Sequence, residues 1–200
     1  KIPVSAYLTD RVDFATFSGH KFHAVRGVGF VYKKAGKKIT PLLTGGGQEK
    51  DFRSTTENVA GIASMAKALR LVTDKEEFSL PKIAKMKKII FDELAKYEDI
   101  SIFSGEGEGF APNILTFGIK GVRGEVIVHA FEEHQIYIST TSACSSKAGK
   151  PAGTLISMGV PTKLAQTAVR ISLDDDNDMG QVEQFLTIFK QVYAKTQKVR

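Results

Sequence analysis

Residues 12–21 read VDFATFSGHK, an apolar run with one charged residue that ends in the sequence Ser18-Gly19-His20-Lys21. Its aromatic and β-branched residues predict a buried strand over 12–17, and a second strand is predicted over 28–32. An amine at the end of a strand, partly withdrawn from water, is a candidate for Schiff-base formation with a carbonyl compound. Lys21 is therefore a candidate catalytic residue.

The only cysteine, Cys144, lies in a polar stretch, residues 139–147, that is rich in serine and threonine. A lone cysteine is more often a small buried apolar residue. This polar neighbourhood argues against burial, however, and a nearby lysine favours the reactive thiolate. A single cysteine forms no internal disulfide, which suits a reducing compartment, and we expect a cytoplasmic location.

Four segments occur in order along the chain: Ser18–Lys21, residues 45–58 with GGGQE and RSTTEN, Ser142–Ser146 and Arg170–Ser172. In this order they resemble the motifs of the cysteine desulfurases, pyridoxal-phosphate enzymes of the class V aminotransferase group. The resemblance implies an α/β fold, that of the fold type I pyridoxal-phosphate-dependent transferases. Residues 1–72 would then be the C-terminal part of the large, cofactor-binding domain. Residues 73–200 would be a small α+β C-terminal domain that carries the cysteine loop.

The resemblance also implies which residues bind the cofactor, pyridoxal 5'-phosphate. Lys21 would form the Schiff base with it and move the proton at the substrate Cα. Ser18 and His20 would bind its phosphate, although His20 by itself is equally well explained as a structural histidine. Thr56 would reach the phosphate in the neighbouring subunit, so a homodimer with shared active sites is expected.

Two further residues are implied to act on the substrate, L-cysteine. Arg170 lies in a predicted strand, where an unpaired charge is costly. The resemblance makes Arg170 a clamp for the substrate α-carboxylate, and a structural ion pair is the alternative. Cys144 would attack the sulfur of the substrate and carry it as a persulfide.

The expected reaction is the conversion of L-cysteine to L-alanine, with the sulfur passed from Cys144 to an iron–sulfur scaffold or a tRNA-thiolation enzyme. The sequence does not choose between these acceptors. One alternative is a class V aminotransferase or selenocysteine lyase-like enzyme in which Cys144 is incidental, and another is a non-enzymatic binding or dimerisation module. Residue 1 corresponds to the middle of such an enzyme. The isolated chain is therefore expected to bind the cofactor poorly and to have little catalytic activity toward L-cysteine.

The composition is that of an ordinary globular chain of 200 residues, with 42% hydrophobic and 25% charged residues and a net charge of +6. No apolar run is long enough to span a bilayer, and no interleaved basic and aromatic residues indicate direct nucleic-acid binding. The acidic run 174–178 lacks calcium-loop spacing, because Gly180 is seventh and Phe185 twelfth. No metal site is expected, and we predict that these acidic residues cap the final helix.

Hydrophobic periodicity predicts the remaining elements. Residues 33–56 are expected to form a long loop. Residues 73–77 are expected to separate two helices and to mark a candidate domain boundary. The expected helices are 57–72, 80–97, 123–134 and 177–196, and the expected strands are 100–103, 113–118, 136–138 and 169–173. The side chains predicted to face inward are Val59, Ile62, Ala63, Ala66, Leu69 and Val72 in the first helix, Ile83, Met86, Ile90 and Leu94 in the second, Val126, Ile127, Ala130 and Phe131 in the third, and Val182, Phe185, Leu186, Phe189 and Val192 in the last.

Overall fold

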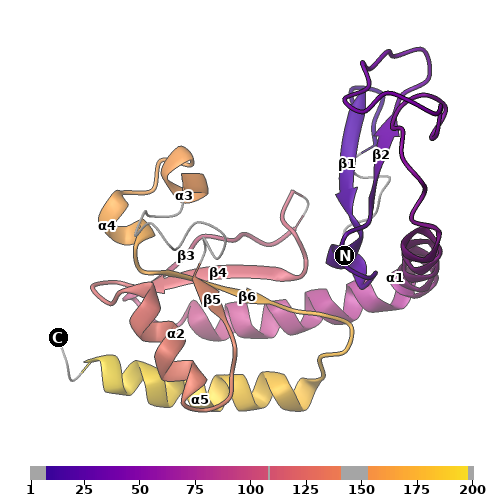
Figure 1. Cartoon of the computed structure of the whole chain (residues 1–200). Helices are drawn as coiled ribbons and strands as arrows, with labels where there is room; N and C mark the ends of the chain where they lie inside the picture. Colours follow the sequence, from indigo (N-terminus) through magenta and orange to yellow (C-terminus); the bar gives the residue numbers. More distant parts are fainter. Residues whose placement is uncertain (1–7, 108, 141–152, 198–200) are drawn as a thin grey trace. The chain divides into compact units, whose positions relative to one another are not determined.

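The computed structural model describes residues 8–107, 109–140 and 153–197 (Figure 1). The chain divides into two compact units, Lys1–Glu77 and Phe78–Arg200, which are described separately below. None of the helices in the described part of the chain combines the length and the apolar character that crossing a membrane requires.

The first unit contains an antiparallel pair of strands. β1 (Phe14–Ser18) pairs with β2 (Gly29–Lys33), and a short 3-10 helix, η2 (Gly19–Phe22), lies between them in sequence. The rings of Phe17 and Phe30 face each other across the pair and stack with their centroids 4.6 Å apart. Both strands predicted around Lys21 are thus confirmed.

A single helix, α1 (Val59–Leu94), follows an irregular connection over residues 34–58. The predicted break at 73–77 is wrong. The hydroxyl of Thr73 donates to the carbonyl oxygens of Leu69 and Arg70, at 3.1 and 2.9 Å, and so bonds back within the helix instead of capping a new one. Pro81 lies inside α1, where it lacks the N–H that a helix interior normally uses.

The first unit has very little core of its own. In the part of α1 that belongs to it, the predicted inward side chains of Val59 and Ile62 are 72% and 38% exposed, which contradicts the prediction for them. Ala24 and Ala68 are the buried apolar side chains among the described residues of this unit.

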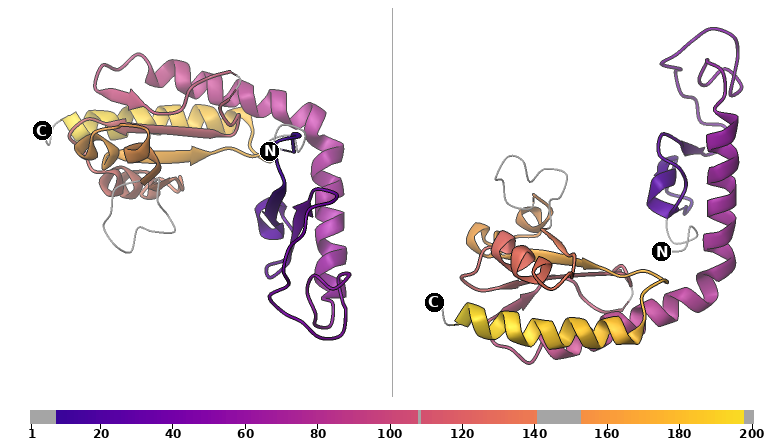
Figure 2. Two further views of the ribbon diagram at one scale, coloured as in Figure 1. Left: turned by 90° about the horizontal axis from the view of Figure 1, so that it is seen from above. Right: turned by 60° about the horizontal axis from the view of Figure 1, so that its bottom comes forward.

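The second unit is an antiparallel four-stranded sheet in the order β3-β4-β6-β5, with longer helices on one face and two short helices on the other (Figure 1). The strands are β3 (Ile100–Ile102), β4 (Ile114–Ile119), β5 (Ser139–Thr140) and β6 (Ala168–Ser172). The helices besides α1 are α2 (Gly124–Glu132), α3 (Gly153–Ser157), α4 (Thr162–Ala165) and α5 (Met179–Gln197). Figure 2 shows α5 and the second part of α1 along the same face of the sheet. The predicted α+β arrangement is confirmed, and α3 and α4 were not predicted.

The main hydrophobic core of this unit lies between the sheet and α1, α2 and α5, and a smaller cluster contains Leu155, Ala165 and Ala168. The predicted inward residues of the second part of α1 and of α5 are confirmed, and the largest of them, Phe189, is fully buried. In α2 the prediction holds for Ile127 and Phe131, whose spacing of four places them on one helix face. Val126 is 53% exposed, so its prediction is wrong. It lies one position before Ile127, which turns its side chain away from the core.

The strand predicted over 136–138 is also misplaced, because β5 starts only at Ser139. The residues before β5 instead form the C-terminal cap of α2. Gln135 takes a left-handed conformation, with φ 58°. Its N–H donates to Glu132 O at 2.9 Å, and the N–H of Ile136 donates to Phe131 O at 3.1 Å. These are the two hydrogen bonds of a Schellman motif, and they keep Ile136 at the helix end rather than in a strand ladder.

The start of α5 is capped as predicted. The N–H of Gln181 donates to Asp178 Oδ1 at 2.9 Å, and the N–H of Asp178 donates to Gln181 Oε1 at 3.3 Å. This reciprocal pair is a capping box, which satisfies two backbone donors that the helix leaves without partners.

A buried lysine of α1 was not predicted. Lys87 is only 4% exposed, and its Nζ donates to the carbonyl oxygens of Gly105 and Ala111, at 2.8 and 3.0 Å. These bonds hold both ends of the β3–β4 connection against the helix. Burial lowers the pKa of the Lys87 amine, and the negative charge of Glu106 opposes this effect.

Replacing Lys87 with methionine is expected to lower the free energy of unfolding by about 1–3 kcal/mol at pH 7, because two carbonyl groups lose their donor. The loss is expected to grow with pH. Since the native pKa lies below the ordinary 10.5, the unfolded chain binds more protons between these two values, and wild-type stability rises through that window relative to the variant. Urea unfolding of both proteins at pH 7 and pH 10 measures the difference. Lys85→Met, an exposed change on the same helix, is the control, and a difference that shrinks with pH would contradict the assignment.

Candidate active site

The segment from Ser18 to Lys21 forms a tight turn at the end of β1. The N–H of Gly19 donates to Val28 O at 2.9 Å, and the N–H of Ala24 donates to Gly19 O at 3.1 Å. Gly19 is buried, and a Cβ added to it would lie only 2.9 Å from Val28 O. The next residue along, Val25, donates its N–H to Ser64 Oγ of α1 at 3.3 Å. The backbone of the turn is thus fixed on both sides.

Three polar side chains project from this fixed turn. Ser18, His20 and Lys21 are all exposed among the described residues. The expected withdrawal of the Lys21 amine from water is therefore wrong for this chain, since no described segment covers it. A hydroxyl, an imidazole and an amine are together suited to binding an anion such as a phosphate, and the amine alone of the three is suited to forming a Schiff base.

Gly29 is expected to be essential to the geometry of this turn. It pairs with Ser18 across the strands, and a Cβ at this position would lie 2.4 Å from the carbonyl oxygen of Phe17. Since that oxygen belongs to the backbone, Gly29→Ala must push the two strands apart beside Ser18. We expect a destabilisation of about 1–3 kcal/mol. Amide chemical shifts of residues 17–22 measure the displacement.

Gly153→Ala is the matched control for this change, because a Cβ at Gly153 meets no atom within 4 Å. It is expected to leave the amide shifts of residues 17–22 unchanged. Unaltered shifts in Gly29→Ala would show that the strands tolerate the extra methyl group.

The glycine-rich connection between β2 and α1 contains a left-handed turn. Glu49, Lys50 and Asp51 have φ angles of 53°, 56° and 66°. The N–H of Asp51 donates to Gly47 O at 3.1 Å, and the N–H of Phe52 donates to Glu49 O at 3.2 Å. Left-handed geometry costs about 1–2 kcal/mol for each residue that is not glycine. Strain of this kind is concentrated at binding and catalytic sites.

Thr56 lies at the end of this connection and is exposed. The residues before it are held locally. The N–H of the buried Ser54 donates to Leu43 O at 3.0 Å, and the Arg53 guanidinium donates to the hydroxyl of Thr55. The role of Thr56 in a neighbouring subunit stays a prediction.

Arg170 belongs to the second unit. It lies on β6, between Thr116 of β4 and Ser139 of β5, and these directly opposed residues share one face of the sheet. Its neighbours in sequence, Val169 and Ile171, face the helical core, so Arg170 faces the other side. Its Nε is buried and makes no hydrogen bond, and Arg170 has no ion-pair partner among the described residues.

The alternative of a structural ion pair for Arg170 thus gains no support from the described residues. A buried guanidinium N–H without an acceptor is costly, and a carboxylate ligand would satisfy it. Cys144 cannot be placed in the same way. It lies outside the described residues, between Thr140 of β5 and Gly153 of α3.

Two further features, one in each unit, were not predicted. Thr116 and Ser139 flank Arg170 through strand register, which periodicity in a sequence does not reveal. Gln48 was quoted only as part of a motif, yet its side-chain oxygen is buried and has no hydrogen-bond donor among the described residues. The sequence did contain a signal for Gln48: it directly follows three glycines, and a glycine-rich loop allows the backbone to approach a ligand closely.

The donor groups present fit pyridoxal phosphate and an amino-acid substrate. Ser18 and His20 would hold the phosphate, and the Lys21 amine would react with the aldehyde. The unsatisfied Nε of Arg170 suits a carboxylate, which is the geometry that guanidinium recognises best.

Comparison with known proteins shows which family the chain belongs to. Residues 7–185 match the family model for class V aminotransferases. A NifS/IcsS protein homolog of Lactobacillus delbrueckii subsp. bulgaricus is 46% identical over 191 residues, which are 96% of this chain and 50% of that protein. The cysteine desulfurase IscS of Dictyoglomus turgidum is 35% identical over 162 residues, 81% of this chain and 41% of that protein. The chain thus spans about half the length of the curated relatives it matches.

Solved structures show the same relationship. The X-ray structure of a NifS-like protein from Rickettsia africae has a TM-score of 0.79 and 32% identity, and the match covers 92% of this chain and 48% of that one. The mixed α/β architecture is therefore that of the fold type I transferases, a family whose enzymes use pyridoxal phosphate. The order of the motifs, the fold and the match over most of the length agree, and the chain belongs to the class V aminotransferase family, among relatives named as NifS-like proteins and cysteine desulfurases.

Proposed function

We propose that this chain supplies the C-terminal half of a pyridoxal-phosphate-dependent cysteine desulfurase, which converts L-cysteine to L-alanine and holds the sulfur as a persulfide. The observation that carries the proposal is the fixed turn that presents Ser18, His20 and Lys21 together. The unsatisfied Arg170 Nε and the names of the relatives support it.

The residues of the chain would divide the chemistry as follows. Arg170 binds the α-carboxylate and thereby orients the amino acid. When bound, the cofactor supplies an electron sink next to the substrate Cα. The Lys21 amine takes up the Cα proton and returns a proton later. Each of these roles uses a group that the described structure leaves available for a ligand.

Sulfur transfer is assigned to Cys144. Its thiolate attacks the substrate sulfur and forms the S–S bond of a persulfide. The C–S bond breaks, its electron pair stays with the substrate Cβ, and a proton there completes the methyl group of alanine. The net reaction is cysteine plus enzyme thiol to alanine plus enzyme persulfide, and the persulfide would pass to an iron–sulfur scaffold or a tRNA-thiolation enzyme.

The proposal includes a homodimer in which Thr56 reaches the cofactor phosphate of the neighbouring subunit, and a cytoplasmic place of action. It also includes low activity of the isolated 200 residues, which the exposed apolar side chains of the first unit support, because they indicate that further protein normally covers them.

Mass spectrometry of the full-length protein after incubation with pyridoxal phosphate and L-cysteine tests the proposal. One added sulfur on the peptide containing Cys144, absent from Cys144→Ala, is the expected result. A protein that processes amino acids but leaves Cys144 unmodified would instead be a class V aminotransferase or a selenocysteine lyase-like enzyme.

A further inference from the structure

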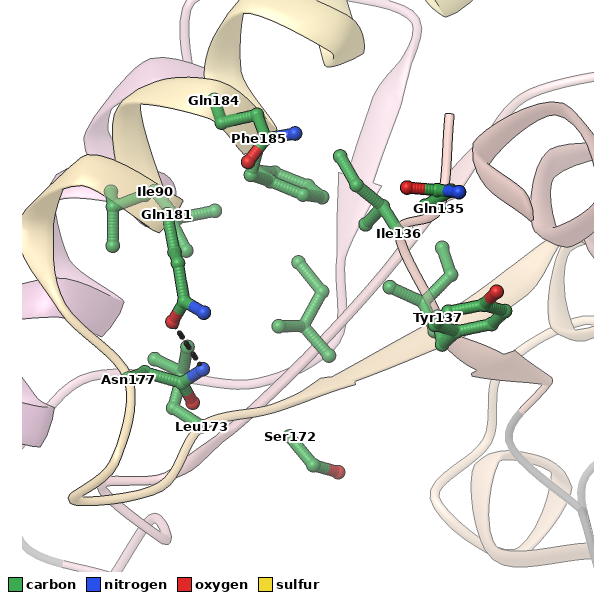
Figure 3. A pocket seen from close by; sticks show the side chains of 13 residues that line it. Ile90, Gln135, Ile136, Tyr137, Ser172, Leu173, Asn177, Gln181, Gln184 and Phe185 are labelled. Carbon is green, nitrogen blue, oxygen red and sulfur yellow. Dashed lines mark hydrogen bonds between the residues drawn. The ribbon is translucent and has the colours of Figure 1, made fainter. Parts of the chain in front are cut away.

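The second unit contains a cavity at the edge of its sheet. It has a volume of about 300 Å³ and opens between the end of β6, the residues before β5 and helix α5 (Figure 3). Its floor is apolar, with Ile90, Ile171 and Phe185 among its lining. Figure 3 shows Asn177 and Gln181 on one side of it and Gln135, Ile136 and Tyr137 on the other. None of the residues assigned to the desulfurase reaction lines this cavity.

The lining is entirely uncharged, although 25% of the residues in the chain are charged. Its polar groups are mostly side-chain amides, those of Gln135, Asn177, Gln181 and Gln184. An amide both donates and accepts hydrogen bonds without carrying charge, as a peptide group does. A charged group placed here would meet no opposite charge in the lining, which favours a neutral occupant.

The sheet leaves an open position at the cavity. The N–H of Leu173 donates to Asn113 O of the β4 side at 2.8 Å. Since alternate residues of an antiparallel strand bond to opposite neighbours, the peptide groups of Ser172 point to the β5 side. There the ladder ends at the Ser139–Arg170 pair, and Tyr137, which would come opposite Ser172 next, does not continue it.

The open position is built into the fold. The Schellman bonds at Gln135 and Ile136 hold the chain at the end of α2, so the segment 136–138 does not close onto β6. The side chains of Ile136 and Ile138 pack against the core and keep the segment in place. Tyr137, between them, is 79% exposed.

We propose that this cavity binds an extended, uncharged peptide segment of a partner protein, which pairs its backbone with Ser172 and places one large apolar side chain on the Ile171–Phe185 floor. This is strand addition to an open sheet edge, in which the backbone provides affinity and a side-chain pocket provides selectivity. Because opposed residues share a face, the residue paired with Ser172 points away from the helices and its neighbour points to the floor.

Nuclear magnetic resonance of the full 200-residue chain tests the proposal with a probe peptide, acetyl-Ser-Thr-Leu-Thr-Ser-amide. We expect a saturable downfield shift of the Ser172 amide proton at millimolar peptide. Two matched peptides, one with aspartate in place of leucine and one N-methylated at both threonines, are expected to bind at least about ten-fold more weakly, because they lose the apolar contact and the backbone donors respectively.

Protein variants complete the test. Gln184→Glu places a charge at the rim of the cavity and is expected to weaken binding of the leucine peptide at least about three-fold. Glu183→Gln, at the preceding residue of α5, is expected to leave the affinity unchanged. Equal binding of all three peptides, or the absence of a saturable shift at Ser172, would overturn the proposal. A Ser172 shift that depends on protein concentration without peptide would also overturn it and would identify a second copy of the chain as the occupant.

Discussion

Replacing Lys21 with alanine in the full-length protein is expected to lower the rate of alanine formation from L-cysteine by at least about 10²- to 10⁴-fold, the range that a positioned proton-transfer group contributes. The reason is structural. Lys21 lies on the same turn as Ser18 and His20, and hydrogen bonds of Gly19 fix the backbone of this turn. Alanine release under saturating cysteine measures the effect.

Two comparisons separate a chemical from a structural role of Lys21. Lys38→Ala, at an exposed lysine of the same unit, is expected to retain wild-type activity. Amide shifts of Ser18 and Gly29 are expected to stay near their wild-type positions in Lys21→Ala, because its exposed side chain supports no packing. A Lys21→Ala protein that keeps more than about a tenth of the wild-type rate would exclude the proposed role.

Truncating Phe189 to alanine is expected to lower the free energy of unfolding of the second unit by about 3–5 kcal/mol. Phe189 is fully buried at the centre of an aromatic cluster. Its ring meets Tyr97 edge-on at a centroid distance of 5.2 Å, and the rings of Phe117 and Phe185 lie at 6.3 Å. The substitution removes both buried surface and these ring contacts, and it leaves a cavity that rigid neighbours cannot fill.

Urea unfolding followed by circular dichroism at 222 nm measures the loss of stability in Phe189→Ala. Phe78→Ala is the control, since Phe78 is 77% exposed and its truncation is expected to change stability by less than about 0.5 kcal/mol. Similar midpoints for the two variants would mean that the aromatic cluster is not the centre of the cooperative core.

Periodicity in the sequence was sufficient where one face of an element meets the core. The spacing of Val182, Phe185, Phe189 and Val192 predicted both α5 and its buried side. The strands around Lys21 were predicted equally well, because β-branched and aromatic residues bordered by glycine leave few alternatives. The candidate residues Ser18, His20 and Lys21 were identified because they are contiguous in the chain.

Periodicity failed where the outcome depends on partners far away in sequence. Residues 73–77, predicted to break the helix, continue it, since the Thr73 hydroxyl bonds back within α1. The strand pattern at 136–138 is overridden by the left-handed Gln135. The flanking of Arg170 by Thr116 and Ser139 and the buried position of Lys87 depend on register and packing. Neither the strand register nor the tertiary packing can be obtained from the sequence alone.

The unequal cores of the two units have a practical consequence for ligand screening. Nearly all buried apolar side chains among the described residues belong to the second unit, so heat absorbed on melting will come mainly from it. A ligand raises the melting temperature only of the part that unfolds together with its site. A compound that binds the Lys21 turn of this chain can therefore leave the observed melting curve unchanged, and a dye-based thermal screen would discard it as inactive.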